Sequence, residues 1–232
     1  MRWLLVLVVG MLAKSAYAEP NEAEKLFRDM EKKIASSKTL ECDFEAKNDS
    51  KDKKANIKAS LTLGEGNKFH LEGSGEAEGK AFKLVVISDG KKLHVVLDGK
   101  AQGKQDNPKH SGEIIRASIT RAGAFTPFFL IAAGPMDEDF KIDEQFAVSD
   151  FKVGKKEKIG DREAQEIQYL LTPKGLKESM SVNVWIDTKT ILPLKRVITI
   201  PLGGDTVTFT ETCSKLTLDP KVDAKKFELP KE

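Results

Sequence analysis

Residues 181–200, SVNVWIDTKTILPLKRVITI, hold two strand-like runs on either side of a polar turn at residues 187–190. In the first run Val182, Val184 and Ile186 fall on one face, because a β-strand alternates its side chains with a period of two. A connection this short joins antiparallel neighbours. The stretch therefore predicts one hairpin of an antiparallel sheet.

The second run of this hairpin begins near Pro193, which has no N–H to donate and suits an edge, a strand start or a bulge. We expect its apolar side chains to share one face, namely Leu192, Leu194, Ile198 and Ile200. Arg196 interrupts this face, and a buried guanidinium there would need a partner or the open end of a barrel.

Residues 1–18 have the pattern of a secretory signal peptide, in which Arg2 precedes an apolar run and Ala16-Tyr17-Ala18 supplies a cleavage site. The apolar run is shorter than the roughly 20 residues that span a bilayer. We expect an exported, periplasmic and soluble mature chain that forms a single domain over residues 19–232.

Charge argues against nucleic acid as a partner. The full chain has 38 Lys and Arg against 36 Asp and Glu, and removal of Arg2 and Lys14 with the signal peptide leaves 36 of each sign. A neutral chain has no long-range field that would steer it to an anionic polymer.

The remaining pattern predicts one helix and a meander of strands. Asn21 can cap a helix whose apolar stripe is Ala23, Leu26, Phe27, Met30 and Ile34, and from Thr39 the period becomes two. Glycine-containing stretches at residues 64–67, 73–75 and 89–90 predict hairpin turns. Val85, Val86 and Ile87 are apolar on both parities, which predicts a strand covered on both faces.

A helical insertion is predicted at residues 114–133, where TPFFLIAAG at residues 126–134 is nearly all apolar. It is too short to span a membrane and therefore suits burial as a lid. The expected fold is mainly β (α+β), an unclosed, strongly curved antiparallel β-barrel of about ten strands with an N-terminal helix and a helical lid over an apolar cavity.

Cys42 and Cys213 are the two cysteines of the chain, and both share a strand parity with apolar neighbours. In an exported protein such a pair predicts a disulfide, with two buried free thiols as the alternative.

Catalytic signatures are lacking. His70, His94 and His110 have no metal-ligand spacing, and the glycine-rich stretches do not match dinucleotide or nucleophile motifs. We therefore expect a protein that is not an enzyme and takes no cofactor or metal.

The hairpin motifs Val184-Trp185-Ile186-Asp187 and residues 190–196, TILPLKR, resemble the late hairpin of the LolA/LolB outer-membrane lipoprotein-carrier superfamily. Three further features occur in the same order: an opening helix followed by a strand with Phe44, the turn SDGKKL at residues 88–93, and a closing segment at residues 223–230.

This resemblance implies a carrier of lipid or lipoprotein that holds acyl chains in an apolar barrel and meets a membrane-bound donor or acceptor protein. The expected ligand-binding residues are Phe125, Phe128, Phe129 and Ile131 of the lid, with Leu84, Val86, Val95 and Val184 opposite. The family's carrier holds its lid with a strand arginine, whereas this chain has Ala46 and Lys47 at the corresponding position. The alternative is a periplasmic lipid-sensing domain that binds a protein partner.

Overall fold

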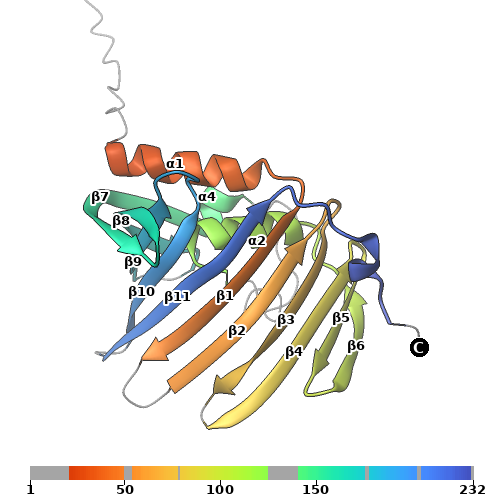
Figure 1. The fold of residues 1–232 in the computed structure, drawn as a ribbon. Helices are drawn as coiled ribbons and strands as arrows, with labels where there is room; N and C mark the ends of the chain where they lie inside the picture. Colours follow the sequence, from red (N-terminus) through yellow and green to blue (C-terminus); the bar gives the residue numbers. More distant parts are fainter. Residues whose placement is uncertain are drawn as a thin grey trace, which may run out of the picture.

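The computed structural model describes residues 21–49, 54–77, 79–124, 141–175, 178–202 and 205–230. The predicted signal peptide lies outside them. The described chain opens with helix α1 (Glu22–Ala35) and continues through six strands, β1 (Leu40–Asp49), β2 (Lys54–Leu63), β3 (Lys68–Ala77), β4 (Lys80–Asp89), β5 (Lys92–Leu97) and β6 (Lys100–Asp106) (Figure 1).

Helix α2 (Ser111–Arg121) and the short helix α4 (Ile142–Gln145) follow. Five more strands come next, β7 (Phe146–Ile159), β8 (Arg162–Pro173), β9 (Met180–Asp187), β10 (Pro193–Leu202) and β11 (Asp205–Leu218), and a 3₁₀ turn, η1 (Ala224–Phe227), closes the chain.

All eleven strands form one antiparallel sheet in the order β6-β5-β4-β3-β2-β1-β11-β10-β9-β8-β7. The first six strands and the last five are each a meander, and the β1–β11 pairing joins the two. Within the described chain β6 and β7 are the edges and do not pair with each other, so the sheet curves strongly without closing. This confirms the predicted unclosed antiparallel barrel.

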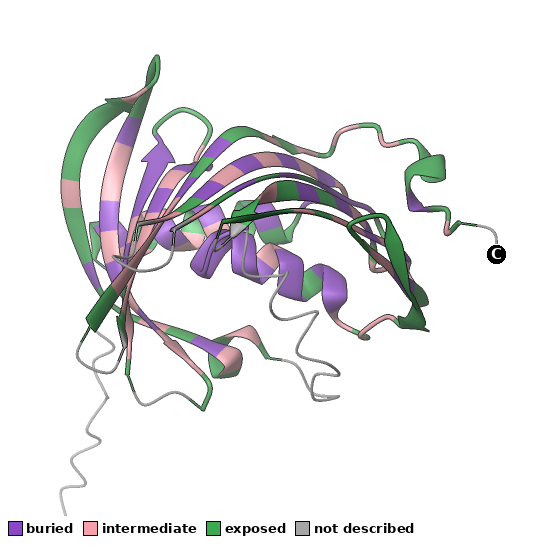
Figure 2. Ribbon diagram, turned by 90° about the horizontal axis from the view of Figure 1, so that it is seen from below, coloured by how far each residue is buried: buried purple, intermediate pink, exposed green. Residues whose placement is uncertain are grey.

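The sheet has an apolar inner face and a polar outer face, as the period of two requires. Inner residues such as Leu40, Cys42, Leu61 and Leu71 join one core with residues of α1 and α2. Figure 2 shows α2 inside the concave side of the sheet, almost wholly buried. The inner face is therefore the side on which the core and the helices lie.

Helix α1 covers the sheet where β7 and β8 curl over. Asn21 caps it as predicted, because its side chain accepts a hydrogen bond from the N–H of Glu24 at 2.9 Å. Phe27 of its buried stripe lies with its ring centroid 5.1 Å from that of Phe151 and 5.0 Å from that of Tyr169. Burial of each such side chain stabilises the fold by about 1.5–3 kcal/mol, so this aromatic group fixes α1 on the sheet.

The hairpin of residues 181–200 forms as predicted, with one correction. The carboxylate of Asp187 accepts hydrogen bonds from the N–H groups of Lys189 and Thr190 at 2.8 and 2.9 Å, which shapes the turn. A bulge between Pro193 and Lys195 reverses the parity of the strand. Leu194 consequently packs beside Trp185 on the outer face and does not share the face of Ile198.

One prediction about the first meander was wrong, and one of its strands was not predicted. Glycines 73–75 make no turn but lie inside β3, where a Cβ at Gly75 would come within 2.2 Å of the carbonyl oxygen of Asn56. Strand β6 was missed because its sequence, KAQGKQD, is polar throughout and fully exposed. It forms as an edge strand because the turn at Asp98 and Gly99, both with positive φ, folds it back onto β5.

Candidate functional site

Helix α2 crosses the inner face of the sheet and is held at both ends. At its first turn the side-chain oxygen of Asn67, in the turn between β2 and β3, accepts a hydrogen bond from the N–H of Gly112 at 3.1 Å. At its last turn the guanidinium of Arg196, on β10, donates to the carbonyl oxygens of Ile119 and Thr120 at 2.7 and 2.9 Å. The helix is therefore fixed to a turn of the first meander and to a strand of the second.

The hydrogen bonds of Arg196 to α2, together with its ion pair to β11, form the Arg196 clasp. They supply the partners that a buried guanidinium on the inner face needs. Arg196 is 1% exposed, and it also donates to the carboxylate of Glu211 on β11 at 3.2 Å. Gly123 adopts φ +100°, and a Cβ there would lie 2.9 Å from the Glu211 carboxylate. The backbone after α2 thus passes directly over the ion pair, which only glycine allows at this distance and φ.

A second buried arginine secures the same end of α2. Arg121, 1% exposed, donates to the carboxylates of Glu31 on α1 and Asp143 on α4, and to the carbonyl oxygen of Phe146 at 2.7 Å. The hydroxyl of Tyr169 donates to the carbonyl oxygen of Arg121 at 2.6 Å, and burial raises the pKa of Tyr169 to about 12. The end of α2 is consequently linked to α1, α4 and β8.

The inner face divides into two halves according to what covers it. The covered half, which joins α2 in the core and is almost fully buried, consists of Leu40, Leu61, Leu63, Phe69, Leu71 and Leu93. The open half lies nearer the opposite strand ends and keeps partly exposed apolar side chains, namely Phe82, Leu84, Val95, Leu97, Ile198, Ile200, Val207 and Phe209. Leu97 is the most exposed of these, at 41%.

The predicted binding residues on the strands fall in different surroundings. Val86 and Val184 belong to the buried core, where Val184 has no exposed surface. Leu84 and Val95 are half-buried and belong to the open half. The structure thus brings all four residues to the inner face but leaves accessible surface chiefly on Leu84 and Val95.

Phe125, Phe128, Phe129 and Ile131 of the predicted lid lie outside the described residues. The part of the insertion that is described, α2, confirms helical structure from residue 111 to residue 121. The open-half residues Phe82, Leu97 and Phe209 are not among those predicted to bind ligand. Their period-of-two alternation marked them as inward-facing, but alternation gives no sign of which inward residues remain uncovered.

Between the large side chains of the open half, the inner positions of the sheet are occupied by small residues. Ala46, Ala59, Gly73 and Gly75 occupy inner positions of β1, β2 and β3. In the register, Leu84 lies opposite Gly73, and Phe82 lies opposite Gly75. Ala46 and Ala59 are themselves buried, at 6% and 8% exposed, so the accessible apolar surface of the open half is that of the larger side chains beside them.

Cys42 and Cys213 face each other across the β1–β11 seam, with their sulfur atoms 3.5 Å apart in a buried position. Both are free thiols in the structure. The hydrogen bond to Cys213 and burial raise the pKa of the Cys42 thiol well above its ordinary value. The geometry places the two sulfurs as the sequence parity predicted, while the disulfide itself stays a prediction.

Groups that could carry catalysis or bind a metal are sparse in the described ranges. No three or more His, Cys, Asp or Glu side chains there gather into a metal-binding arrangement. Among the helices that the structure describes, none has the length and apolar character needed to cross a bilayer.

Comparison with solved structures finds matches at low sequence identity. The lipoprotein LppX of Mycobacterium tuberculosis is 14% identical, with a TM-score of 0.46 over 86% of this chain and 99% of that one. LprF of Mycobacterium bovis is 11% identical, with a TM-score of 0.49 over 86% and 96%. A LolA superfamily protein of Nitrosomonas europaea is 9% identical, with a TM-score of 0.37 over 90% and 99%.

The structures that this comparison finds include a member of the superfamily that the sequence motifs resemble. No curated protein matches the sequence. A family model matches residues 23–231, and the chain therefore belongs to the family described as predicted periplasmic protein (DUF2092).

Proposed function

We propose that this protein is an exported, periplasmic and non-catalytic binder or carrier of lipid acyl chains, which it takes up on the open half of the inner face. The proposal rests on the partly exposed apolar side chains of the open half. They are Phe82, Leu84, Val95 and Leu97 on β4 and β5, and Ile198, Ile200, Val207 and Phe209 on β10 and β11. Inward apolar side chains that a protein leaves uncovered commonly mark a binding surface.

Affinity for such a ligand requires no reactive group. Each methylene removed from water contributes about 0.8 kcal/mol, so ten of them give about 8 kcal/mol before the cost of immobilising the ligand is subtracted. The absence of a recognisable catalytic motif from the sequence fits this kind of site.

The Arg196 clasp could couple the binding of acyl chains on the open half to the stability of α2. It joins α2, β10 and β11 at the border between the covered and the open half, beside Ala46 in the register. A ligand that fills the open half would press against the same elements. We therefore expect α2 to exchange its amide hydrogens more slowly when acyl chains are bound.

The test is binding of a fluorescent fatty acyl probe to a matched pair of variants on β5. Leu97→Gln places an amide on the inner face, whereas Val96→Gln places it on the outer face of the same strand. We expect Leu97→Gln to weaken probe binding and Val96→Gln to leave it unchanged, with little change in thermal stability in either. Equal binding by both variants, or no binding by the wild type, would contradict the proposal.

The alternative of a lipid-sensing domain predicts a different response. A sensor changes its hold on a protein partner when lipid arrives, whereas a carrier releases lipid to a membrane. Capture of envelope proteins with and without added fatty acid separates the two, since lipid-dependent capture favours the sensor.

A further inference from the structure

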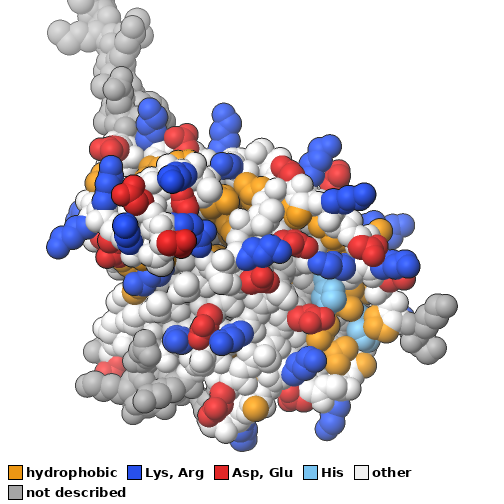
Figure 3. Space-filling model, viewed as in Figure 1, with side chains coloured by type: hydrophobic (Ala, Val, Ile, Leu, Met, Phe, Trp, Pro, Cys, Tyr) orange, Lys and Arg blue, Asp and Glu red, His pale blue; other side chains and the backbone are white. Residues whose placement is uncertain are grey.

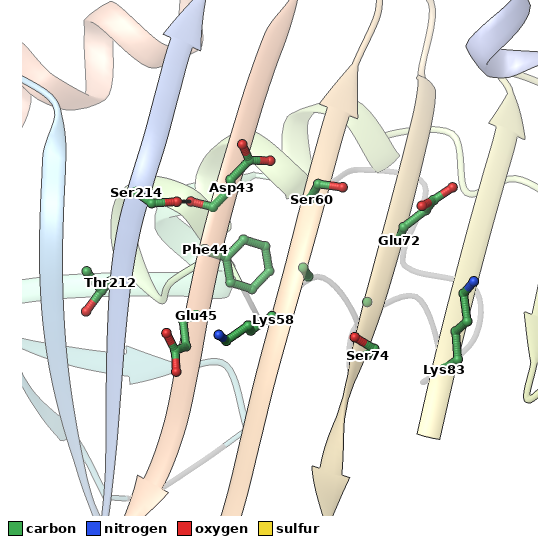
Figure 4. Close-up of a pocket in the computed structure, with 12 residues that line it drawn as sticks. Asp43, Phe44, Glu45, Lys58, Ser60, Glu72, Ser74, Lys83, Thr212 and Ser214 are labelled. Atoms are coloured by element: carbon green, nitrogen blue, oxygen red, sulfur yellow. Dashed lines mark hydrogen bonds between the residues drawn. The ribbon is translucent and has the colours of Figure 1, made fainter. Parts of the chain in front are cut away.

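The outer face of the sheet, opposite the core, has a solvent-open hollow of about 570 Å³ that extends across β11, β1, β2, β3 and β4 and is bordered mostly by charged and hydroxyl residues. Figure 3 shows this face, on which charged side chains stand apart on a surface of backbone and uncharged polar side chains. Figure 4 shows the side chains that line the hollow, chiefly carboxylates, ammonium groups and hydroxyls. Its size suits a small polar ligand.

The strand register explains the hollow and sorts its charges into two rows. In the basic row Lys58 of β2 lies opposite Ser74 of β3, which in turn lies opposite Lys83 of β4. In the acidic row Asp43 of β1 lies opposite Ser60 of β2, which lies opposite Glu72 of β3. Because each serine is shorter than its charged neighbours, both rows are lowest at their centres.

The spacing of the rows sets the size of the groups that they could hold. Adjacent strands lie about 4.8 Å apart, and residues two apart on a strand are separated by about 7 Å. Lys58 and Lys83, on flexible stems, can therefore both reach an anion above Ser74. A cation about 7 Å along the strands would lie over the acidic row.

These charged groups do not form ion pairs with one another in the described chain. The ammonium groups of Lys58 and Lys83 and the carboxylate of Asp43 form no ion pair or hydrogen bond in the described chain. Glu45 lies directly opposite Lys58 but pairs with Lys47 at 3.3 Å. The carboxylate of Glu72 lies 3.1 Å from Nε2 of His70 and is still more than half exposed.

We propose that this hollow binds a zwitterionic group in which a phosphate and a primary ammonium are joined by a short linker, as in phosphoethanolamine. The phosphate is held over Ser74 by Lys58 and Lys83, and the ammonium lies at Asp43 and Glu72. Lysine and hydroxyl donors suit a phosphate, and carboxylates suit an ammonium. The site is on the opposite face from the proposed acyl surface and does not depend on it.

Titration calorimetry with phosphoethanolamine tests the proposal on side chains whose replacement leaves the fold intact, since they are exposed or outward-facing. Lys58→Gln and Lys83→Gln should each weaken binding about tenfold or more, whereas Lys100→Gln, an exposed lysine on β6 outside the hollow, should change nothing. Asp43→Asn should weaken binding of phosphoethanolamine but not of inorganic phosphate. No saturable binding, or the same affinity in Lys58→Gln as in Lys100→Gln, would overturn the site.

Two further measurements identify the ligand and its source. If inorganic phosphate binds as tightly as phosphoethanolamine and Asp43→Asn has no effect on either, the zwitterionic assignment is wrong. Sedimentation with phosphatidylethanolamine vesicles, compared with phosphatidylcholine vesicles, separates a membrane headgroup from the free molecule. Binding to the first kind of vesicle that Lys58→Gln abolishes supports the headgroup, and calorimetric binding without vesicle binding supports the free molecule.

Discussion

The covered and open halves of the inner face belong to one sheet and follow the same alternation of side chains, yet they differ in what lies over them. In the covered half Phe69 and Leu71 are at most 1% exposed because α2 and the core pack on them. In the open half Leu84 and Val95, on strands that also contribute to the core, keep part of their surface. An apolar inner face is therefore a packed core at one end and an available surface at the other.

The largest expected effect tests this contrast by truncation. Phe69→Ala in the covered half should lower the free energy of unfolding by about 3–5 kcal/mol, because it opens a cavity in packed surroundings. Leu97→Ala in the open half should cost under about 1 kcal/mol, since one side of that residue already lacks neighbours. Urea unfolding followed by the fluorescence of Trp185, the single tryptophan of residues 19–232, measures both. Similar losses would show that the halves do not differ.

The Arg196 clasp at the border of the two halves gives the next prediction. Arg196→Met should destabilise the protein by about 3 kcal/mol or more, because it breaks a buried ion pair and leaves the carbonyl oxygens of Ile119 and Thr120 without their donor. Hydrogen exchange should then quicken in α2. Arg116→Met is the control, since Arg116 donates to the carbonyls of Ser37 and Lys38 in a partly exposed position. Unchanged α2 exchange in Arg196→Met would contradict the clasp.

Cys42 on β1 and Cys213 on β11 lie side by side on the inner face, where the pairing of these two strands joins the two meanders. We expect a disulfide there in the exported protein, and its reduction should lower the free energy of unfolding by about 2–4 kcal/mol. Because the Cys42 thiol has a raised pKa and is buried, alkylation must follow denaturation to count thiols. Intact mass then decides the matter, and two alkylated cysteines in unreduced material would exclude the bond.

The smallest effect at neutral pH concerns Tyr169, the single tyrosine of residues 19–232. Tyr169→Phe should cost about 1 kcal/mol through the lost hydrogen bond to Arg121. With a folded pKa of about 12 against about 10 unfolded, the protonated phenol contributes stability that is complete below pH 10 and declines as pH rises to 12 and above. Alkaline difference absorbance should show tyrosinate appearing near pH 12, and ionisation near pH 10 in folded protein would refute this.

Sequence pattern was sufficient for the inner and outer faces, the Asn21 cap, the Asp187 turn and the open antiparallel sheet, because each depends on local alternation or on a single side chain. It misplaced Leu194, whose parity depends on a bulge, and the glycines of β3, which serve close packing between strands. It missed β6, which carries no apolar signal. The Arg196 clasp depends on β10, β11 and α2 meeting in space, and no local pattern reports such a contact.

The claim that acyl chains bind to the open half is tested most directly by methyl NMR with a fatty acid that carries a nitroxide on its chain. The proposal predicts that the methyl signals of Leu84, Val95, Leu97 and Ile198 broaden at low probe concentration. The outer-face methyls of Val85 and Val96, on the same strands, should keep their intensity. Equal broadening on both faces of β4 and β5, or none on the inner face, would contradict it.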